Sequence, residues 1–274
     1  MSRAALDVIN GSERFAILHG DCTKILKQLP GLVVDACITD PPYDAKTHDS
    51  ARRTRELPDT AEHACRNRRK IEIGFAPLSP ETQDAVAFEA SRLVKRWFLS
   101  FCTLEMVDGW RSAITRHERL EYVRTGIWHR LCATPQVTGD RPGTSCEAIV
   151  IGHALSVKRK PIRKRWNGGG THAFWQYKTV VPRLGRGDPR LHETQKPIDL
   201  MLRLVELFTE PDDLVLDPFS GSGTTGAACM RLGRRFIGIE QRKEDVVTSR
   251  ARLQAELEHT TMAARRDGQI GLFE

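Results

Sequence analysis

No stretch of the sequence approaches the roughly eighteen consecutive apolar residues that a membrane-spanning helix needs, so no transmembrane segment is predicted. The first residues also lack the basic start and the apolar run of a secretory signal. The chain contains neither an internal repeat nor a low-complexity segment. These absences predict a cytoplasmic protein that has no membrane partner.

Cysteine is present but shows no pairing pattern. The seven cysteines include no Cys-x-x-Cys pair, so neither a zinc site nor a disulfide framework is expected, and no metal ligands are predicted. Cys37 and Cys102 lie in apolar runs and are interpreted as small core residues.

The composition is that of a soluble globular protein, with 40% hydrophobic and 28% charged residues among 274. This length allows one large α/β domain or two small ones. Lys and Arg number 42 against 35 Asp and Glu, which gives a net charge of +7. That excess is weak evidence for a polyanionic partner.

Short apolar runs bounded by turn residues alternate with amphipathic runs at helical spacing. Strands are predicted over 15–19, 33–39, 97–102, 122–128, 148–152, 214–216 and 236–239. Helices are predicted over 23–29, 224–232 and 245–257, and two more are predicted to begin at 79 and at 197. The helix that begins at 79 has an apolar face that reaches Trp97. Such alternation implies an α/β fold with a mostly parallel sheet that is covered on both faces.

Two segments interrupt this alternation. Residues 44–74 are polar and Arg-rich, and we interpret them as a long mobile loop of functional importance. Residues 155–190 hold ten Lys and Arg against one acid, with aromatic residues and Gly168–Gly170 among them. A charge run is usually a solvated surface, but this mixture favours nucleic acid. The residues predicted to contact it are Lys158, Arg159, Lys160, Arg163, Lys164, Arg165 and Trp166.

A glycine-rich loop over 217–225 follows one predicted strand and opens a helix, where parallel sheets bind nucleotide-like ligands. It has no Gly-Lys-Ser/Thr, which disfavours a Walker phosphate loop, and Gly226 has the wrong spacing for a dinucleotide site. Asp217 at the strand end suits a cationic ligand better than a pyrophosphate. The loop therefore favours S-adenosylmethionine over a turn with a purely structural role. Glu240 closes the next strand, where an acid holds ribose hydroxyls in this type of fold.

A second chemical motif, Asp40-Pro41-Pro42-Tyr43, ends the strand predicted over 33–39. Asp and Pro are common turn residues, but a turn does not explain the aromatic residue after two prolines. An exocyclic amine of a nucleobase is a poor nucleophile, because its lone pair is delocalised into the ring. A carboxylate and a backbone carbonyl that accept both N–H protons would localise that lone pair. Tyr43 would supply a stacking platform for a base rotated out of its duplex.

These segments resemble the amino-methyltransferases of DNA, which methylate N6 of adenine or N4 of cytosine. Their signature is Asp/Asn/Ser-Pro-Pro-Tyr/Phe/Trp with a Phe-x-Gly-x-Gly loop, matched here by 40–43 and 219–223. The catalytic segment precedes the loop, which is similar to the permuted beta group. The resemblance covers roughly residues 15–257. It implies a single methyltransferase domain over 1–274 with a Rossmann-like, mostly parallel seven-stranded sheet.

The resemblance also implies site residues. Gly20-Asp21-Cys22 is similar to a segment of the group whose Asp lies against the adenine of the cofactor. His192–Pro197 resembles its His-x-Thr-Gln-Lys-Pro, which holds the methionine end. Trp128 and Glu147 fall where the group often has a Trp and a Glu on later strands, but Arg130 replaces a usual Lys. The residues predicted to bind S-adenosylmethionine are Asp21, Cys22, Thr194, Lys196, Pro197, Asp217, Phe219, Gly221, Ser222, Gly223, Thr224 and Glu240.

The leading hypothesis is a site-specific methyltransferase for N6 of adenine in double-stranded DNA, acting by base flipping. Cytosine N4 enzymes more often have Ser at the first motif position, so Asp40 favours adenine and leaves cytosine as the alternative. A non-catalytic DNA-binding protein of the same fold would be expected to have lost Asp40, Tyr43 or the loop glycines. The resemblance leaves open a homodimer and a separate cognate restriction endonuclease, and 153–190 is the predicted target-recognition segment.

Overall fold

The structure is a computed structural model of the chain. It describes residues 1–43, 77–131, 133, 140, 142–156, 158, 160, 163–179 and 196–266, and the side chains of the last helix only as far as Glu258. The helices are α1 (Arg3–Ile9), α2 (Cys22–Leu26), α4 (Pro80–Leu93), η1 (Leu104–Met106), α5 (Val107–Arg116), α6 (Ile198–Phe208), α7 (Thr224–Arg231) and α8 (Lys243–Arg266). The strands are β1 (Phe15–His19), β2 (Val34–Thr39), β3 (Val94–Cys102), β4 (Leu120–Arg130), β5 (Cys146–Ala154), β6 (Phe174–Tyr177), β7 (Leu214–Asp217) and β8 (Arg235–Glu240).

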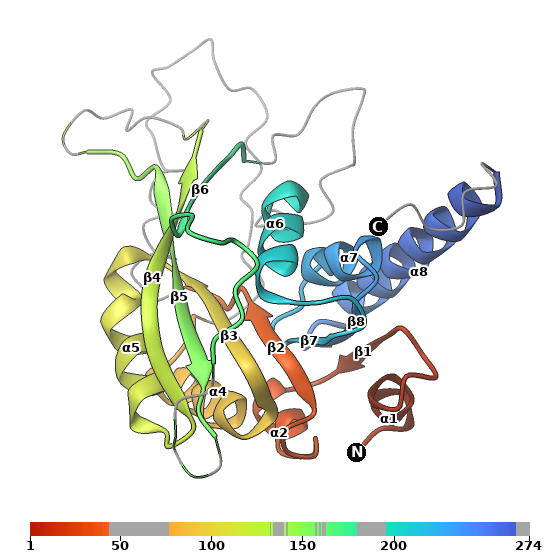
Figure 1. The fold of residues 1–274 in the computed structure, drawn as a ribbon, viewed down its shortest axis with the longest axis horizontal. Helices are drawn as coiled ribbons and strands as arrows, with labels where there is room; N and C mark the ends of the chain where they lie inside the picture. Colours follow the sequence, from red (N-terminus) through yellow and green to blue (C-terminus); the bar gives the residue numbers. More distant parts are fainter. Residues whose placement is uncertain are drawn as a thin grey trace, which may run out of the picture.

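The described strands form one sheet in the order β1-β8-β7-β2-β3-β5-β4-β6 (Figure 1). The pairs from β1 to β3 are all parallel, β5 is antiparallel to both of its neighbours, and β6 is parallel to β4. This is the predicted α/β class. The sheet has eight strands where seven were expected, because Phe174–Tyr177 pairs with the end of β4 as an additional edge strand.

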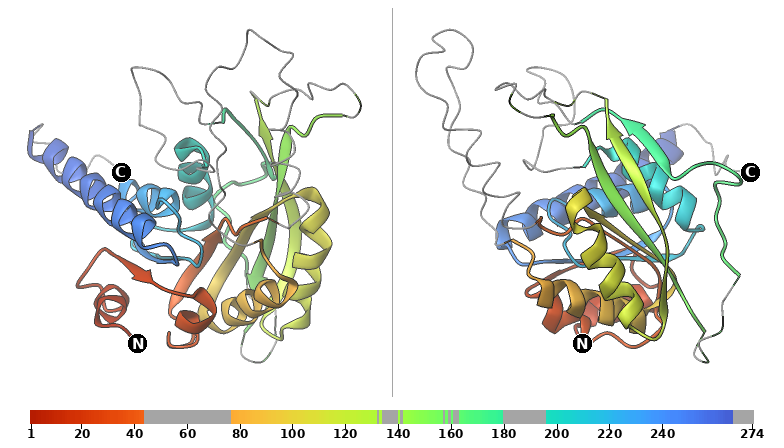
Figure 2. Two further views of the ribbon diagram at one scale, coloured as in Figure 1. Left: turned by 180° about the vertical axis from the view of Figure 1, so that it is seen from behind. Right: turned by 90° about the vertical axis from the view of Figure 1, so that its left-hand side faces the viewer.

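Helices cover both faces of the sheet, as the buried apolar runs of its strands require. One core packs α1, α2, α4 and α5 against the sheet around Trp110 and Phe98, and the other packs α6, α7 and α8 around Phe208 and Phe236. The gold helices α4 and α5 and the blue helices α7 and α8 lie on opposite sides of the sheet in Figure 1 and in both views of Figure 2.

The predicted elements were largely correct, but the helix from Ser79 ends earlier than its apolar face suggested. Ser79 caps α4 through its side chain and Pro80 occupies the first turn, as expected. The helix stops at Leu93, and Val94 and Trp97 belong to β3. Val94 pairs with Val34 and Trp97 with Ala36, so the two residues are buried by strand pairing and not by a helix face.

Two α-helices, and the short 3-10 helix η1, were missed by the sequence analysis. α1 is only 7 residues long, and Arg235 holds its last turn by donating to the carbonyls of Val8 and Ile9, both at 2.9 Å. α5 has no side-chain cap and buries one face, which includes Trp110, against the sheet. Over the part of the chain that the structure describes, no helix is long and apolar enough to span a bilayer.

Candidate functional site

The sequence motifs meet at one edge of the sheet, which we call the carboxyl edge. There the parallel strands β1, β8, β7 and β2 end side by side, at His19, Glu240, Asp217 and Thr39. Because β5 is antiparallel to β3, it begins at the same edge with Cys146 and Glu147. Crevices outside the carboxyl ends of parallel strands are the usual ligand sites of α/β sheets. Motifs up to about two hundred residues apart are thus neighbours.

The glycine loop between β7 and α7 has the backbone of a close-approach turn. Gly221 has φ +50°, and a side chain there would meet open space, whereas Gly223 has φ +78°. A Cβ on Gly223 would lie 2.5 Å from the Ser249 hydroxyl, so the helix α8 forbids any side chain at this position. Gly221 therefore presents bare backbone outward, and Gly223 lets the loop pack closely on α8.

Asp217 faces the protein interior. Its carboxylate accepts hydrogen bonds from the Thr39 hydroxyl at 2.7 Å, the Thr225 hydroxyl at 2.7 Å and the Phe219 amide at 3.1 Å. The side chain is 2% exposed, and burial raises the pKa of this carboxyl to about 6 despite those bonds. Asp217 thereby fixes the start of the loop on β2 and α7.

Glu240 and Asp21 also hold backbone at the carboxyl edge. Glu240 accepts the Gly221 amide at 2.9 Å and the Arg242 amide at 2.7 Å, so it joins the loop to the turn after β8. Asp21 caps α2, and its hydrogen bonds with Thr23 lower the pKa of its carboxyl. Cys22 follows it with its side chain buried, and burial raises the pKa of that thiol to about 12.

Asp40, Tyr43 and Lys196 form the most densely bonded polar group at this edge. The Lys196 ammonium donates to both carboxylate oxygens of Asp40, at 2.7 and 2.8 Å, and to the Tyr43 hydroxyl at 3.0 Å. Pro41 is buried and Pro42 half-buried, which fixes the backbone between the two polar side chains. Lys196 was predicted to bind the cofactor, and in the structure its ammonium contacts Asp40.

Glu147 completes this group from the start of β5. It accepts the Tyr43 hydroxyl proton in a hydrogen bond and lies 3.2 Å from the Lys196 ammonium, and Arg130 approaches its other oxygen at 3.7 Å. We call Asp40, Tyr43, Glu147 and Lys196 the edge cluster. Burial and the Glu147 carboxylate raise the pKa of Tyr43 well above its usual value, so its hydroxyl is protonated.

Aromatic rings surround the ammonium of the edge cluster. It lies 5.0 Å from the ring centroid of Phe101, 5.2 Å from that of Tyr43 and 5.8 Å from that of Trp128. Phe101 was absent from the predicted site, and its only signal was an aromatic residue near the end of a buried strand. Trp128 and Glu147 were marked by family resemblance alone, because β4 and β5 are distant from the motif in sequence.

The basic residues predicted to contact nucleic acid lie away from the carboxyl edge, and their contact with DNA stays a prediction. β5 runs away from the carboxyl edge, and Ala154 stands about 23 Å along the strand from Glu147. Of these cations the structure describes Lys158, Lys160, Arg163, Lys164 and Arg165, which are exposed near the opposite, amino edge of the sheet. Lys164 pairs there with Glu121 at the start of β4, at 2.5 Å.

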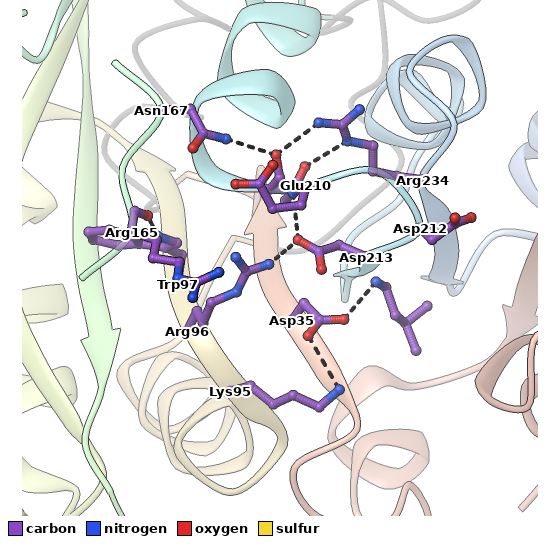
Figure 3. Close-up of polar contacts among 12 residues, drawn as sticks. Asp35, Lys95, Arg96, Trp97, Arg165, Asn167, Glu210, Asp212, Asp213 and Arg234 are labelled. Carbon is purple, nitrogen blue, oxygen red and sulfur yellow. Dashed lines mark hydrogen bonds and ion pairs between the residues drawn. The ribbon is translucent and has the colours of Figure 1, made fainter. Parts of the chain in front are cut away.

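Trp166, which was also predicted to contact nucleic acid, is half-buried against a helix. Its ring packs against Phe208 with centroids 4.8 Å apart, and its indole N–H donates to the Gly169 carbonyl at 2.9 Å. Figure 3 shows how the flanking backbone is held: the Trp97 indole donates to the Arg165 carbonyl at 2.7 Å. Asn167 donates to the Thr209 carbonyl at 3.1 Å, which Arg234 also contacts at 2.8 Å.

Some predicted features lie outside the described residues. These are the loop over 44–74, Arg159, Thr194 and the part of 155–190 beyond Thr179. Of the described cofactor candidates, Pro197 caps α6 and Phe219 packs partly buried on the core, while Ser222 and Thr224 are buried beneath the loop. No group of three metal-ligating side chains occurs among the residues that the structure describes.

Comparison with known proteins identifies relatives for this arrangement. Residues 116–250 match the model of the N6/N4 methyltransferase family, which is described as DNA methylase. The chain is 29% identical to YubD of Escherichia coli (strain K12), a protein named as a methylase, over 226 residues, or 81% of this chain and 83% of that one. It is 54% identical over 67 residues to the type II methyltransferase M2.DpnII of Streptococcus pneumoniae, about a quarter of each chain.

Solved structures agree with these relatives. The complex of M1.HpyAVI with S-adenosylmethionine is 25% identical, with a TM-score of 0.58 that covers 87% of this chain and 100% of that one. The cytosine-N4-specific PvuII DNA methyltransferase shares the fold, with a TM-score of 0.60, 17% identity and 92% coverage of both chains. These likenesses support the N6/N4 amino-methyltransferase family of DNA methylases for this chain.

Proposed function

We propose that the protein transfers a methyl group from S-adenosylmethionine to N6 of an adenine flipped out of double-stranded DNA. The observation that carries this proposal is the Asp40 carboxylate at the carboxyl edge, beside a ring-lined site and one strand away from the glycine loop. A carboxylate in that place can accept protons from an amine while aromatic rings stack on its base.

The choice of adenine rests on Asp40 as the first residue of the motif, since cytosine N4 enzymes more often carry Ser there. Cytosine N4 remains the second candidate, because the PvuII enzyme of similar fold is specific for that atom. Either base presents an exocyclic amine, so the edge cluster would treat both by the same chemistry. Glu147 and Tyr43 at its rim are placed to distinguish the ring edges.

Three groups of the chain would hold the cofactor, and a fourth would support the loop. Gly221 leaves open space in front of the loop, which fits a ligand that approaches backbone closely. Glu240 lies at the end of β8 for the ribose hydroxyls, and Asp21 lies at the end of β1 for the adenine. Asp217 supports the loop from inside, so we assign it a positioning role and no direct contact with the sulfonium.

The reaction itself needs little from the chain beyond orientation and one proton acceptor. S-adenosylmethionine supplies an electrophilic methyl group on a sulfonium. Asp40 and a backbone carbonyl of the Pro41–Pro42 turn would each accept a hydrogen bond from one N–H group of the target amine. These two hydrogen bonds would orient the amine so that its lone pair is no longer delocalised into the ring. As the new N–C bond forms and the S–C bond breaks, the amine nitrogen loses one proton to Asp40 and from there to water. A neutral methylated amine and a thioether result.

The test is product identification. Purified protein, unmethylated duplex DNA and S-adenosylmethionine with a labelled methyl group are incubated, and the DNA is digested to nucleosides for mass spectrometry. We expect labelled N6-methyladenine. Labelled N4-methylcytosine would establish the second candidate, and no label in DNA would refute both. Asp40→Ala serves as the control for a contaminating methylase. Sequencing of methylated positions then gives the recognition sequence, while the homodimer and the restriction endonuclease stay predictions.

A further inference from the structure

The Lys196 ammonium stands where the target amine has to go. It bridges both oxygens of Asp40 at 2.7 and 2.8 Å, and three aromatic rings lie within 5.8 Å of it. Its side chain is 8% exposed, so the position is closed to solvent. A base amine that donates to Asp40 from between those rings would need the position that the ammonium occupies.

We propose that Lys196 is a placeholder for the target amine: in the free enzyme its ammonium occupies the Asp40 carboxylate, and it passes to Glu147 when the flipped base enters. This inference rests on the proposed function, because it takes the occupant of the site to be the amine of a base. It assigns Lys196 a positioning role that differs from the cofactor contact implied by family resemblance.

Glu147 keeps the free-energy cost of this exchange small. Its carboxylate already lies 3.2 Å from the ammonium, so Lys196 can release Asp40 by a small rotation and keep a negative partner. A buried ammonium that lost its partner altogether would cost several kcal/mol. Tyr43 donates to the same carboxylate and accepts from Lys196 at 3.0 Å, so it spans both positions.

The charges around Asp40 favour a cation at this point before the base arrives. Burial by itself lowers the pKa of Lys196, but the carboxylates of Asp40 and Glu147 outweigh it and raise that pKa, so the ammonium stays charged. Among the described residues, the other titratable groups near Asp40 include Asp217 on β7, Tyr43, Cys102 on β3 and, through Glu147, Arg130 on β4. The placeholder thus holds the Asp40 carboxylate in a fixed orientation before the base arrives.

The test compares four variants on a duplex that carries the mapped site. Lys196→Met keeps a long apolar stem and removes the donor, while Lys196→Arg keeps a charge that can hold Asp40 with two parallel bonds. Glu147→Gln removes the charge of the second acceptor. Lys95→Met is the matched control, because Lys95 pairs with Asp35 at the amino edge. Base extrusion is read by permanganate oxidation of the thymine opposite the target adenine, with methyl transfer and cofactor affinity measured separately.

We expect Lys196→Met to raise permanganate reactivity about threefold or more, and Lys196→Arg and Glu147→Gln to lower it by a similar factor, because they retain the cation on Asp40. In Lys196→Met the KM for DNA falls or stays unchanged, kcat falls, and the acidic limb of the pH profile moves to higher pH. Affinity for S-adenosylmethionine stays within about twofold in all four variants.

Two results would overturn the inference. One is an equal loss of extrusion in Lys196→Met and Lys196→Arg, which indicates a structural ion pair. The other is a tenfold or greater loss of cofactor affinity in both, which returns Lys196 to the cofactor. Should Lys196→Met fail to fold, Lys196→Arg and Glu147→Gln decide alone, since an unchanged extrusion in both contradicts the placeholder. A wild type that methylates no adenine refutes the proposed function instead, before any variant is compared.

Discussion

The Thr39 hydroxyl donates to the Asp217 carboxylate at 2.7 Å, and this bond joins the two motifs of the site. Thr39 ends β2 directly before Asp40, and Asp217 ends β7 directly before the glycine loop. Both side chains are buried, so if one of them were removed, water could not take its place in the hydrogen bond unless the surrounding residues repacked. The motif that begins at Asp40 and the glycine loop therefore share one anchor between neighbouring strands.

That anchor predicts a pH signature for Asp217→Asn. The folded state raises the pKa of Asp217 from 3.8 to about 6, so between these values it binds a proton that the unfolded chain releases. Asp217 therefore contributes less stability as pH rises through this window, by about 3 kcal/mol in total. In Asp217→Asn that contribution disappears. Urea unfolding at pH 4 and pH 7 measures it as the difference between variant and wild type, and identical pH dependence of the two proteins would contradict it.

Gly221→Ala should weaken cofactor binding by more than its effect on folding stability explains, and Gly233→Ala is the matched control. Gly221 and Gly233 both have positive φ, +50° and +71°, and neither position has a heavy atom within 4 Å of an added Cβ. Ala at either should therefore cost a similar 1–2 kcal/mol, roughly, of folding free energy. Only Gly221 lies at the carboxyl edge, so only Gly221→Ala should weaken S-adenosylmethionine binding, by about tenfold or more in calorimetry. Equal cofactor affinity in the two variants would show that the loop does not face the ligand.

Asp40→Ala should abolish methyl transfer and leave cofactor affinity nearly unchanged. Asp40 is assigned to the target amine, and loss of a positioned proton acceptor costs about a hundredfold or more in rate. Asp84→Ala is the control, because Asp84 pairs with Arg116 on the surface of the α4–α5 layer. Single-turnover rates and calorimetry report the two properties. More than a tenth of the wild-type rate in a folded variant would be inconsistent with the assignment.

Local patterns predicted the central sheet well, because its buried strands are short apolar runs that end at turn residues. The same patterns placed Asp40, Gly221 and Glu240 at strand ends, and parallel pairing was enough to bring those ends together. The edge cluster could not be predicted in this way. Its contact between Lys196 and Asp40 spans 156 positions of sequence and depends on where α6 begins relative to β2.

The position of the basic segment in the fold could not be predicted from its composition, and its role in DNA binding stays a prediction. Charge and aromatic content around Trp166 are typical of nucleic-acid binding. They do not indicate at which edge of the sheet β5 ends and the basic segment begins. An antiparallel β5 delivers Lys158 to the amino edge, and Phe208 then covers Trp166. The strand β6, at Phe174–Tyr177, was missed because two of its residues, Phe174 and Gln176, are exposed, so it forms no continuous apolar run like that of β7.

The position of β6 yields a prediction for the salt dependence of DNA binding. β6 runs parallel to β4 and pairs Tyr177 with Arg130, so the exposed Lys178 follows it at the carboxyl edge, on the side of the edge cluster. A duplex that delivers its base to Asp40 passes that edge, and each phosphate contact contributes about 0.9 to the slope of log affinity against log salt.

Lys178→Gln should therefore lower that slope by about one unit, whereas the joint change of Lys158, Lys160 and Arg163 to Gln should alter it by less than about half a unit. The three cations of the second variant stand at the amino edge, about 23 Å of strand away from Glu147, which is more than two Debye lengths at physiological salt. Fluorescence anisotropy with one labelled duplex at several salt concentrations measures both slopes. A loss of about two to three units in the triple variant, with none in Lys178→Gln, would instead place the phosphate backbone along the basic segment.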